Sequence, residues 1–330
     1  MKLSLCMIIK DEAYFLDECL GAVVPLVDEI VIVDTGSTDG SREIALRYTD
    51  RVYDFEWIDD FAAARNYGLE RATGDWALVL DADEAISPSD FSALREAMSS
   101  DRHDGFYLTA RSYTDDSQRS GIHVAAPDDP MCRGYRYYYT YRIMKLFRLQ
   151  TGIAYAGRIH EIVDASVAES RRGTLDAVLH HYAEANPDRP RAERALRYLA
   201  MMEEELAERD DGRLFAIAGA TALKFTDRFD KAERYLLRAV ELGYDADRSL
   251  EGAAEAAYRA GEPGVARDRY QWLYRQGYRT PSVCLNLANL CVRAGDRDQG
   301  VRLLRECLAL GGLGEEIDAV IQRNIRFLEG

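Results

Sequence analysis

The sequence lacks the marks of a secreted or membrane-spanning protein. Its six cysteines form no C-x-x-C pair and mostly lie in apolar runs, which indicates reduced, packed thiols in a cytoplasmic protein. The apolar stretch at the amino terminus is ended by Lys10, so it is too short for a signal sequence. No later run is long enough to cross a bilayer, and we expect no transmembrane segment.

Positive charge is also scarce. Lys and Arg number 42 against 57 Asp and Glu, which gives a formal net charge of -15. A surface of this average charge repels a phosphate backbone, so no nucleic-acid partner is expected. At 330 residues and 47% hydrophobic content, the chain is long enough for two domains with buried cores.

The common phosphate-binding loops are missing as well. Neither G-x-x-x-x-G-K-[ST] nor G-x-G-x-x-G occurs, and the glycines from Gly36 to Gly40 fit neither spacing. An ATP or dinucleotide site is therefore weakly supported. Zinc is not expected either, because no third histidine or cysteine stands at ligand spacing from His180 and His181.

The amino-terminal part of the sequence predicts an alternation of strands and helices. Strands are predicted at residues 3–9, 29–34 and 51–55 and after Gly74, with helices over 12–23 and 61–72. This order is typical of an α/β domain with a mostly parallel sheet.

Further strands are predicted at residues 105–110 and 143–148. Residues 112–141 between them are polar, and we interpret them as a loop over an acceptor site. An amphipathic edge strand is the alternative for the tyrosines of this segment, which are Tyr135, Tyr137, Tyr138, Tyr139 and Tyr141.

Acidic residues follow two of the predicted strands. Asp81 and Asp83 would point the same way if their strand continued, and converging carboxylates favour Mg²⁺ or Mn²⁺ bound to substrate phosphates. Glu84 is expected to point elsewhere and to begin a loop. Asp34 could accept a hydrogen bond from a ribose or a base. Alternatively, Asp81 and Asp83 belong to a solvated acidic loop, and Asp34 caps a helix or stabilises a turn.

Four ordered segments resemble family 2 glycosyltransferases of the GT-A fold. They are Leu5–Glu12, Ile32–Ser41, Ala64–Gly68 and Gly74–Glu84. The resemblance implies a GT-A domain, which we assign to residues 1–185. It also implies an inverting enzyme that moves a hexose or N-acetylhexosamine from a UDP-sugar to an acceptor, with Mg²⁺ or Mn²⁺.

The resemblance further implies roles for single residues. Asp34 would contact the uracil or ribose, and Asp39 would support that pocket. Arg65 would lie against the base or its phosphate. Asp81 would lie near the ribose and the metal, and Asp83 would bind the metal directly.

A later segment, Gly157–Glu161, is similar to a G-x-I-H-E segment in the subgroup of these enzymes that carries helical repeats. The resemblance implies that Glu161 is the catalytic base and that His160 orients the donor diphosphate. The rival bases are acids of the predicted loop: Asp115, Asp116, Asp128 and Asp129.

GT-A enzymes often complete the metal shell with a histidine after the last strand. His180 and His181 are the candidates here, and we favour His181. The subgroup usually has a segment similar to H-x-G-Y, whereas Ala183 follows Tyr182 in this chain, so the choice stays open. Two ordinary histidines at a strand end are the alternative.

Residues 186–330 are predicted to be an all-α domain. Alanine recurs every 34 residues at Ala220, Ala254 and Ala288. The same period relates three further sets: Ala232, Ala266 and Gly300; Leu236, Tyr270 and Leu304; Gly243, Gly277 and Gly311. The pattern resembles three tetratricopeptide repeats, flanked by helices near 191–208 and 315–328.

Together these features predict a glycosyltransferase with a nucleotide-sugar donor and a peptide, protein or glycan acceptor. The repeats would bind the acceptor peptide or form a homodimer. Two other functions remain open: a repeat-based binding module with an inactive GT-A domain, and a nucleotidyltransferase.

Overall fold

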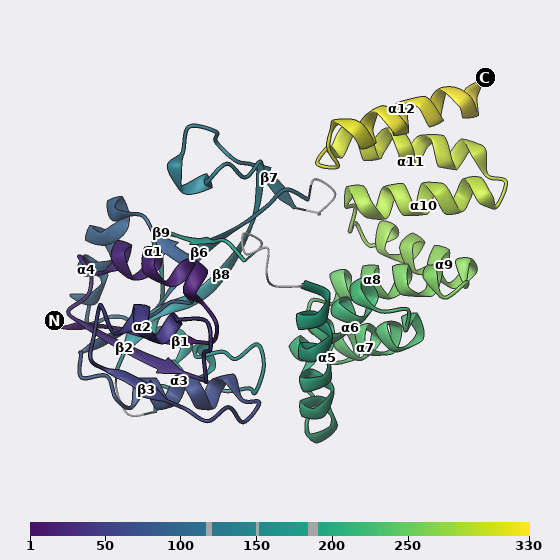
Figure 1. Cartoon of the computed structure of the whole chain (residues 1–330). Helices are drawn as coiled ribbons and strands as arrows, with labels where there is room; N and C mark the ends of the chain where they lie inside the picture. The colour runs from purple at the N-terminus through teal and green to yellow at the C-terminus, as the bar shows by residue number, and fades with distance from the viewer. Residues whose placement is uncertain (117–120, 150–151, 184–190) are drawn as a thin grey trace. The chain divides into compact units, whose positions relative to one another are not determined.

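The computed structural model describes residues 1–116, 121–149, 152–183 and 191–330 (Figure 1). These residues form two compact units, one that comprises residues 1–115 and 122–183 and another that contains residues 191–330. The predicted boundary near residue 185, with its proline-containing segment 186–190, lies outside the described residues. The boundary therefore stays a prediction.

The first unit is built on one sheet. Among the described residues the sheet has nine strands, in the order β3-β2-β1-β4-β8-β6-β9-β5, and β7 pairs with β8. The strands are β1 Leu3–Ile9, β2 Glu29–Asp34, β3 Val52–Asp54, β4 Trp76–Val79, β5 Glu84–Ile86, β6 Gly105–Thr114, β7 Ile122–Val124, β8 Tyr137–Arg148 and β9 Arg172–His181. Strands β3, β2, β1 and β4 are parallel, and β8 then runs antiparallel to β4.

The helices of this unit cover both faces of the sheet. They are α1 Ala13–Val23, α2 Ser41–Ala45, α3 Phe61–Leu69 and α4 Phe91–Met98. Short 3-10 turns in the described part of this unit lie at Pro88–Asp90, Pro130–Cys132, Asp164–Ser166 and Glu169–Arg171.

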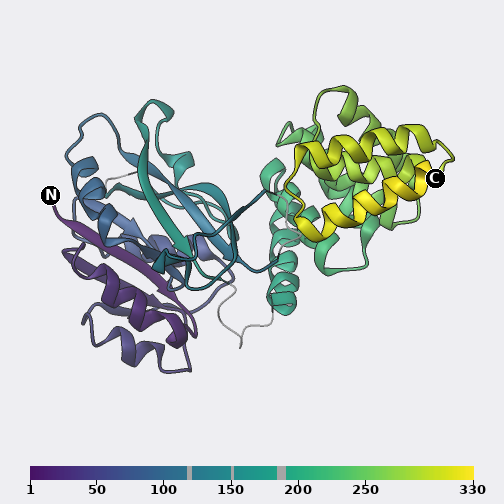
Figure 2. The ribbon, with the colours of Figure 1, turned by 90° about the horizontal axis from the view of Figure 1, so that it is seen from above.

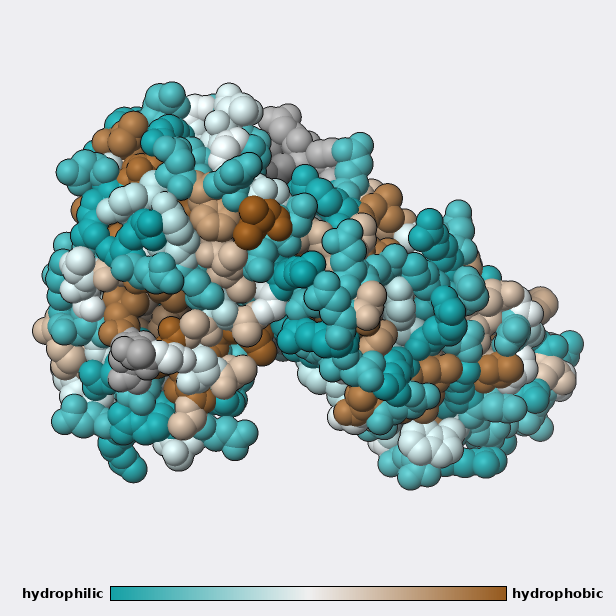
Figure 3. All heavy atoms as spheres, turned by 90° about the horizontal axis from the view of Figure 1, so that it is seen from below, coloured by the Kyte–Doolittle hydropathy of each residue, from teal (hydrophilic) through white to brown (hydrophobic). Residues whose placement is uncertain are grey.

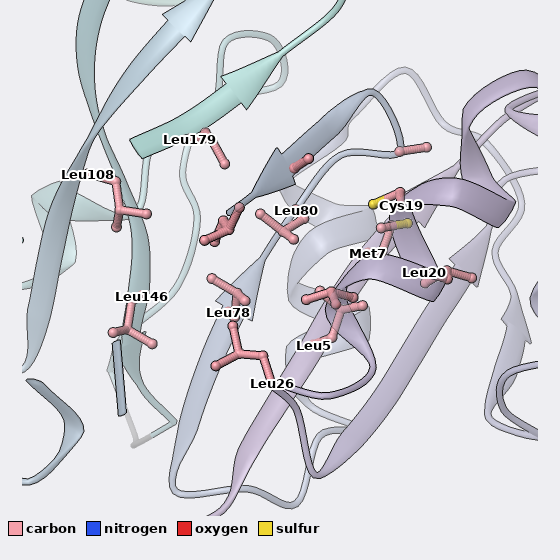
Figure 4. Packing of buried hydrophobic residues seen from close by; sticks show 14 of the residues in the cluster. Leu5, Met7, Cys19, Leu20, Leu26, Leu78, Leu80, Leu108, Leu146 and Leu179 are labelled. Carbon is pink, nitrogen blue, oxygen red and sulfur yellow. The ribbon is translucent and has the colours of Figure 1, made fainter. Parts of the chain in front are cut away.

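Strand β1 shows why the sheet has two covered faces. Its residues are almost all buried, as expected for a central parallel strand, and they alternate between two cores. Leu5 and Met7 pack with α1, where Figure 4 shows them near Cys19 and Leu20. Cys6 packs on the other face with residues of α3. The α/β class predicted from the sequence is confirmed.

The segment predicted as an acceptor loop differs in part from expectation. Strand β6 extends to Thr114 and β8 begins at Tyr137, so the tyrosines from 137 to 141 belong to a strand. Tyr137, Tyr138 and Tyr139 are not on an edge, because β6 and β7 flank this part of β8. The alternation of half-buried and exposed residues explains why a long polar stretch forms a strand here.

The second unit contains eight helices among its described residues. They are α5 Arg191–Glu208, α6 Gly212–Phe225, α7 Phe229–Glu241, α8 Ala246–Arg259, α9 Pro263–Arg275, α10 Pro281–Arg293, α11 Arg297–Leu310 and α12 Glu315–Glu329. Each helix packs on the next along the chain, and Figure 2 shows the stacked helices from above. The predicted all-α repeat architecture is confirmed.

The 34-residue period has a clear structural basis. Ala254 and Ala288 are fully buried, and Gly243 and Gly277 adopt positive φ at the ends of their helices. The first repeat differs, because Ala220 is exposed. The close approach there is made by the neighbouring residue Gly219, where an added Cβ would lie 2.6 Å from Leu236 Cγ.

The six cysteines are all free and buried, as the apolar sequence context predicted. No helix of the described residues has the length and apolar content that a bilayer crossing needs. Most of the surface seen in Figure 3 is hydrophilic, and hydrophobic residues occur there in small groups. Such scattered groups are normal for a protein surface.

Candidate functional site

The candidate site lies where parallel strands end. Ile9 of β1 is in register with Asp34 of β2, and β4 runs beside β1 on its other side. The chain segments that follow β1, β2 and β4 therefore leave the sheet at one edge. Crevices at such edges are where open α/β sheets bind ligands.

Two of the predicted nucleotide-binding acids organise the loop after β2. Asp34 is 3% exposed, and its Oδ1 accepts hydrogen bonds from the backbone N–H of Gly36 and Ser37 at 3.0 and 2.8 Å. Asp39 accepts from the N–H of Ala13 at 2.9 Å and from that of Ser41 at 3.0 Å. Both carboxylates thus fix backbone, and the turn role considered for Asp34 is present.

The pKa of Asp39 is consistent with this role. Burial alone would raise it, but the hydrogen bonds from Ser41 and Ala13 outweigh burial and lower it. The bond to Ala13 also satisfies an N–H in the first turn of α1. Asp39 therefore connects the loop after β2 to the helix after β1, and nucleotide contacts of Asp34 and Asp39 stay predictions.

Arg65 links three segments of the chain. It lies on α3, whose first turn is capped by the Asp60 side chain accepting from Ala63 N at 2.8 Å. Its Nη2 donates to Asp81 Oδ1 at 2.8 Å, and its Nε donates to Glu161 Oε1. Its Nη1 is buried and has no hydrogen-bond partner within the described part of the chain. A buried donor in this state is a place where a ligand oxygen is expected.

Lys145 is the second cation of the site, and sequence analysis missed it. Its side chain is 3% exposed, and Nζ lies 2.7 Å from Glu84 Oε2 and 3.3 Å from Asp81 Oδ2. Burial opposes the charge on Lys145, but the two carboxylates outweigh burial and raise its pKa. The cations of Arg65 and Lys145 in turn outweigh burial at Asp81 and lower the pKa of that carboxyl.

A signal for Lys145 was present in the sequence. It stands in the apolar strand segment from Ile143 to Phe147, where a lysine is buried only if it has an ionic partner. That partner includes Glu84, which was expected to begin a loop. The structure corrects this, because Glu84 is 3% exposed, opens strand β5 and accepts a hydrogen bond from Asp81 N at 2.9 Å.

The strand does not continue through Asp81 and Asp83. The condition under which their side chains would point the same way is therefore not met. Strand β4 ends at Val79 and a turn precedes β5, so the two side chains have different partners. Asp81 is held by Arg65 and Lys145. Asp83 instead has His181 as its neighbour, with 3.7 Å between Oδ2 and Nε2.

The two histidines of β9 have different environments. His181 Nδ1 lies 3.1 Å from Ser112 Oγ and 3.3 Å from the Tyr141 hydroxyl, which leaves Nε2 toward Asp83. His180 Nδ1 shares a 2.7 Å hydrogen bond with the Tyr113 hydroxyl, and the two rings stack. Burial lowers the pKa of His180 to about 4. Consecutive strand residues face opposite sides of a sheet, which explains the difference.

The loop that carries His160 and Glu161 is anchored on α3. Asn66 Nδ2 donates to Tyr155 O at 3.0 Å, and Tyr155 N donates back to Asn66 Oδ1 at 2.8 Å. His160 has a positive φ of 52°. This anchoring brings the Glu161 carboxylate to Arg65, and the Tyr155 ring lies under the guanidinium at 5.4 Å.

The rival loop acids have other contacts. Asp115 Oδ1 accepts from the Arg136 N–H at 3.1 Å, and Asp129 Oδ1 accepts from the Met131 N–H at 2.8 Å. Asp116 and Asp128 are exposed. Glu161 is the one of these five acids that contacts Arg65 in the described structure.

The carboxylate and imidazole groups of the site are the candidate ligands for Mg²⁺ or Mn²⁺. Within the described ranges, no group of three or more His, Cys, Asp or Glu residues is close enough to hold an ion. Both oxygens of Asp81 are already paired with cations. Asp83 and His181 form a two-ligand pair, and this fits an ion that substrate phosphates would also bind.

Comparison with known proteins identifies the family of this domain. The model of glycosyl transferase family 2 matches residues 4–163. This range includes every candidate residue except the two histidines of β9. Residues 4–163 therefore form a glycosyl transferase family 2 domain, and the GT-A fold class expected from the sequence is confirmed.

Similar proteins cover different parts of the chain. A TPR repeat-containing protein of Synechococcus elongatus is 29% identical over 283 residues, which are 82% of this chain and 65% of the relative. The lipopolysaccharide core biosynthesis glycosyltransferase LpsC of Rhizobium meliloti is 30% identical over 122 residues, which are 34% of this chain and 43% of LpsC. The chain thus spans less than two thirds of the length of both relatives.

Among solved structures, S. aureus TarS 1-349 in complex with UDP-GlcNAc is similar at 15% identity and a TM-score of 0.42. The match covers 84% of this chain and 92% of the TarS chain.

Proposed function

We propose that the sheet unit is a glycosyltransferase that moves a hexose or N-acetylhexosamine from a UDP-sugar to an acceptor, with inversion at the transferred carbon. The observation that carries this proposal is the pairing of Arg65 with Asp81 beside the Asp83–His181 pair, at the edge where β4 ends. A cation-binding pair next to a buried guanidinium suits a nucleoside diphosphate.

The donor would be held by Arg65, Asp34 and His160. Arg65 Nη1, buried without a partner in the described residues, would donate to the donor's phosphate or base. Asp34 and Asp39 keep the loop after β2 in shape, and Asp34 Oδ2 would accept from the nucleoside. His160, held at a positive φ, would contact the diphosphate.

Asp83 and His181 would hold Mg²⁺ or Mn²⁺, and we do not assign His180 to the metal because its Nδ1 is bonded to Tyr113 in a buried stack. Asp81 would act beside the ion, since its oxygens are bonded to Arg65 and Lys145. When bound, the ion supplies positive charge to the departing diphosphate.

Glu161 would act as the base. The acceptor hydroxyl oxygen attacks the anomeric carbon of the donor, and a new carbon–oxygen bond forms. The bond between that carbon and the diphosphate oxygen breaks, and its electron pair leaves with UDP. The hydroxyl proton passes to Glu161 Oε2, because Oε1 accepts from Arg65.

The helical unit would supply the second function. Repeats of stacked helices present extended surfaces, and we propose that this unit contacts a protein or peptide acceptor or a second copy of the chain. Light scattering coupled to size-exclusion chromatography would show the dimer as a doubling of the 37.3 kDa mass.

The catalytic proposal is tested by UDP release. The purified chain is incubated with UDP-hexoses and UDP-N-acetylhexosamines in Mn²⁺, and UDP and pyrophosphate are both measured. We expect UDP and no pyrophosphate, with the signal lost in EDTA and restored by Mn²⁺. Pyrophosphate as the product would select a nucleotidyltransferase instead.

The matched variants are Asp83→Asn and Asp101→Asn. Loss of a metal ligand should reduce turnover by about 10²–10⁴-fold. Asp101 is fully exposed, so its substitution should leave turnover unchanged. Equal rates for the two variants, or no nucleotide-sugar bound by the wild-type chain, would contradict the proposal.

A further inference from the structure

A cleft of about 610 Å³ opens on the sheet unit and has no role in the site described above. The amino-terminal turns of α1 form one wall, with Tyr14 and Glu18. The segment around the short turn between β7 and β8 forms the other, with Arg133 and Tyr135, and Asp115 follows the end of β6. Its volume lies within the range of about 300–1,000 Å³ that is usual for small-molecule sites.

Each wall of the cleft is connected to the segment from Asp81 to Asp83 through one further residue, Cys19 on one side and Tyr182 on the other. Cys19, the residue after Glu18, has its Sγ 3.7 Å from the carbonyl oxygen of Asp81. The Arg133 guanidinium lies 3.8 Å from the centre of the Tyr182 ring, and Tyr182 N donates to Asp83 O at 2.9 Å. A molecule in the cleft would therefore be separated by these two residues from the turn that carries the candidate metal ligand.

The lining offers flat aromatic faces together with polar side chains. Tyr14 is 59% exposed, and the Tyr135 ring is stacked on Tyr113, which fixes its orientation. Aromatic faces pack against the apolar faces of rigid ring molecules. The carboxylates of Glu18 and Asp115 accept hydrogen bonds from hydroxyl groups, and the guanidinium of Arg133 donates them.

Each acid of the cleft lining faces an arginine, which is Arg133 of the lining for Glu18 and Arg136 outside the lining for Asp115. Arg133 Nη2 lies 2.7 Å from Glu18 Oε1, and Arg136 Nε lies 3.4 Å from Asp115 Oδ1. Because each cation already faces an anion, the lining gives no net attraction to a phosphorylated or acidic acceptor. It favours a neutral molecule with many hydroxyl groups.

We propose that this cleft is the acceptor subsite and that it binds a neutral glycan, with a sugar ring against Tyr14 and hydroxyls on Glu18 and Arg133. The inference rests on the proposed glycosyl transfer, since it places the acceptor next to the donor. It narrows the acceptor from peptide, protein or glycan to a neutral glycan, and it leaves a second copy of the chain as the partner of the helical unit.

The test uses the full chain, a panel of neutral oligosaccharides and three variants. Tyr14→Ala removes the exposed ring, Glu18→Gln removes one hydroxyl acceptor while keeping the side-chain shape, and Trp272→Ala removes a ring of the helical unit that is 49% exposed. Binding of each oligosaccharide is measured by calorimetry, and transfer from a UDP-sugar is measured in parallel. Donor hydrolysis without acceptor is the third readout.

We expect at least one oligosaccharide to bind, and Tyr14→Ala and Glu18→Gln to weaken that binding and raise the acceptor KM by about tenfold. Donor hydrolysis should stay unchanged in both variants, and Trp272→Ala should match the wild type in all three readouts.

The possible results distinguish the glycan subsite from the proposed glycosyl transfer. Donor hydrolysis with no glycan binding, or transfer to peptides alone, would overturn the glycan subsite and leave the transferase standing. Glycan binding that depends on Tyr14 in a chain that hydrolyses no UDP-sugar would support the subsite and refute the transferase. Unchanged glycan binding in both variants would refute the placement in this cleft.

Discussion

Replacement of Lys145 by methionine should destabilise the sheet unit more than any other loss of a single lysine. Its ammonium is 2.7 Å from Glu84 and 3.3 Å from Asp81, and its side chain is 3% exposed. At an effective dielectric constant of about 20, these contacts correspond to about 6 and 5 kcal/mol of gross attraction. Burying the charges of Lys145 and Glu84 costs several kcal/mol each, so the net value is smaller.

The largest effect of this substitution on stability comes from the Glu84 charge, which loses its partner. Methionine fills a similar volume but leaves Glu84 buried without its cation, and breaking a buried pair in this way costs about 3–5 kcal/mol. Asp81 is affected less, because its side chain is 36% exposed and Arg65 still neutralises it. We therefore expect Lys145→Met to lower the free energy of unfolding by about 3–5 kcal/mol.

A second substitution, Glu84→Gln, completes a double-mutant cycle with Lys145→Met. The double variant Lys145→Met/Glu84→Gln has no unpaired buried charge at this position, so it should be at least about 2 kcal/mol more stable than the sum of the single effects predicts. Lys2→Met is the matched control. It breaks a 3.5 Å pair with Glu29 in which the lysine is 42% exposed, and should cost less than about 1 kcal/mol.

The measurement is urea unfolding followed by tryptophan fluorescence. A Trp272→Phe background removes the tryptophan of the helical unit and leaves Trp57 and Trp76 to report on the sheet unit. A cost below about 1 kcal/mol for Lys145→Met, or strict additivity in the cycle, would refute the view that this lysine neutralises the buried carboxylate of Glu84.

Two further predictions concern stability. Burial alone would raise the pKa of Glu29, but hydrogen bonds from Ser4 and Thr73 lower it to about 2, so its stabilisation is complete above about pH 4.5 and is lost as pH falls toward 2. The stability difference between wild type and Glu29→Gln, measured by urea unfolding, should therefore shrink across this interval, and a constant difference would contradict the assignment. Gly219→Ala should destabilise the helical unit by about 1–3 kcal/mol, because its Cβ would lie 2.6 Å from Leu236 Cγ. Thermal unfolding by circular dichroism would check this, and donor hydrolysis by the sheet unit should stay unchanged.

Only some residues of the candidate site could be predicted from the sequence. The order of acidic segments pointed to Asp34, Asp81 and Asp83 because each follows a strand whose apolar run is visible in one dimension. Lys145 and Glu84 come from β8 and β5, which are far apart in the sequence and are not neighbours in the sheet, so their ion pair had no local signal of matching strength. The choice between His180 and His181 was likewise undetermined, since it depends on which side of β9 Asp83 lies.

The sequence by itself determined the fold class of each half, because periodicity of apolar residues and a 34-residue repeat are local properties that follow from helix and strand geometry. Only the tertiary structure decided that Asp81 pairs with Arg65 and Lys145 while Asp83 lies by His181. The physical reason is that the energy of a buried charge depends on its neighbours in space, and these come from segments far apart in the chain.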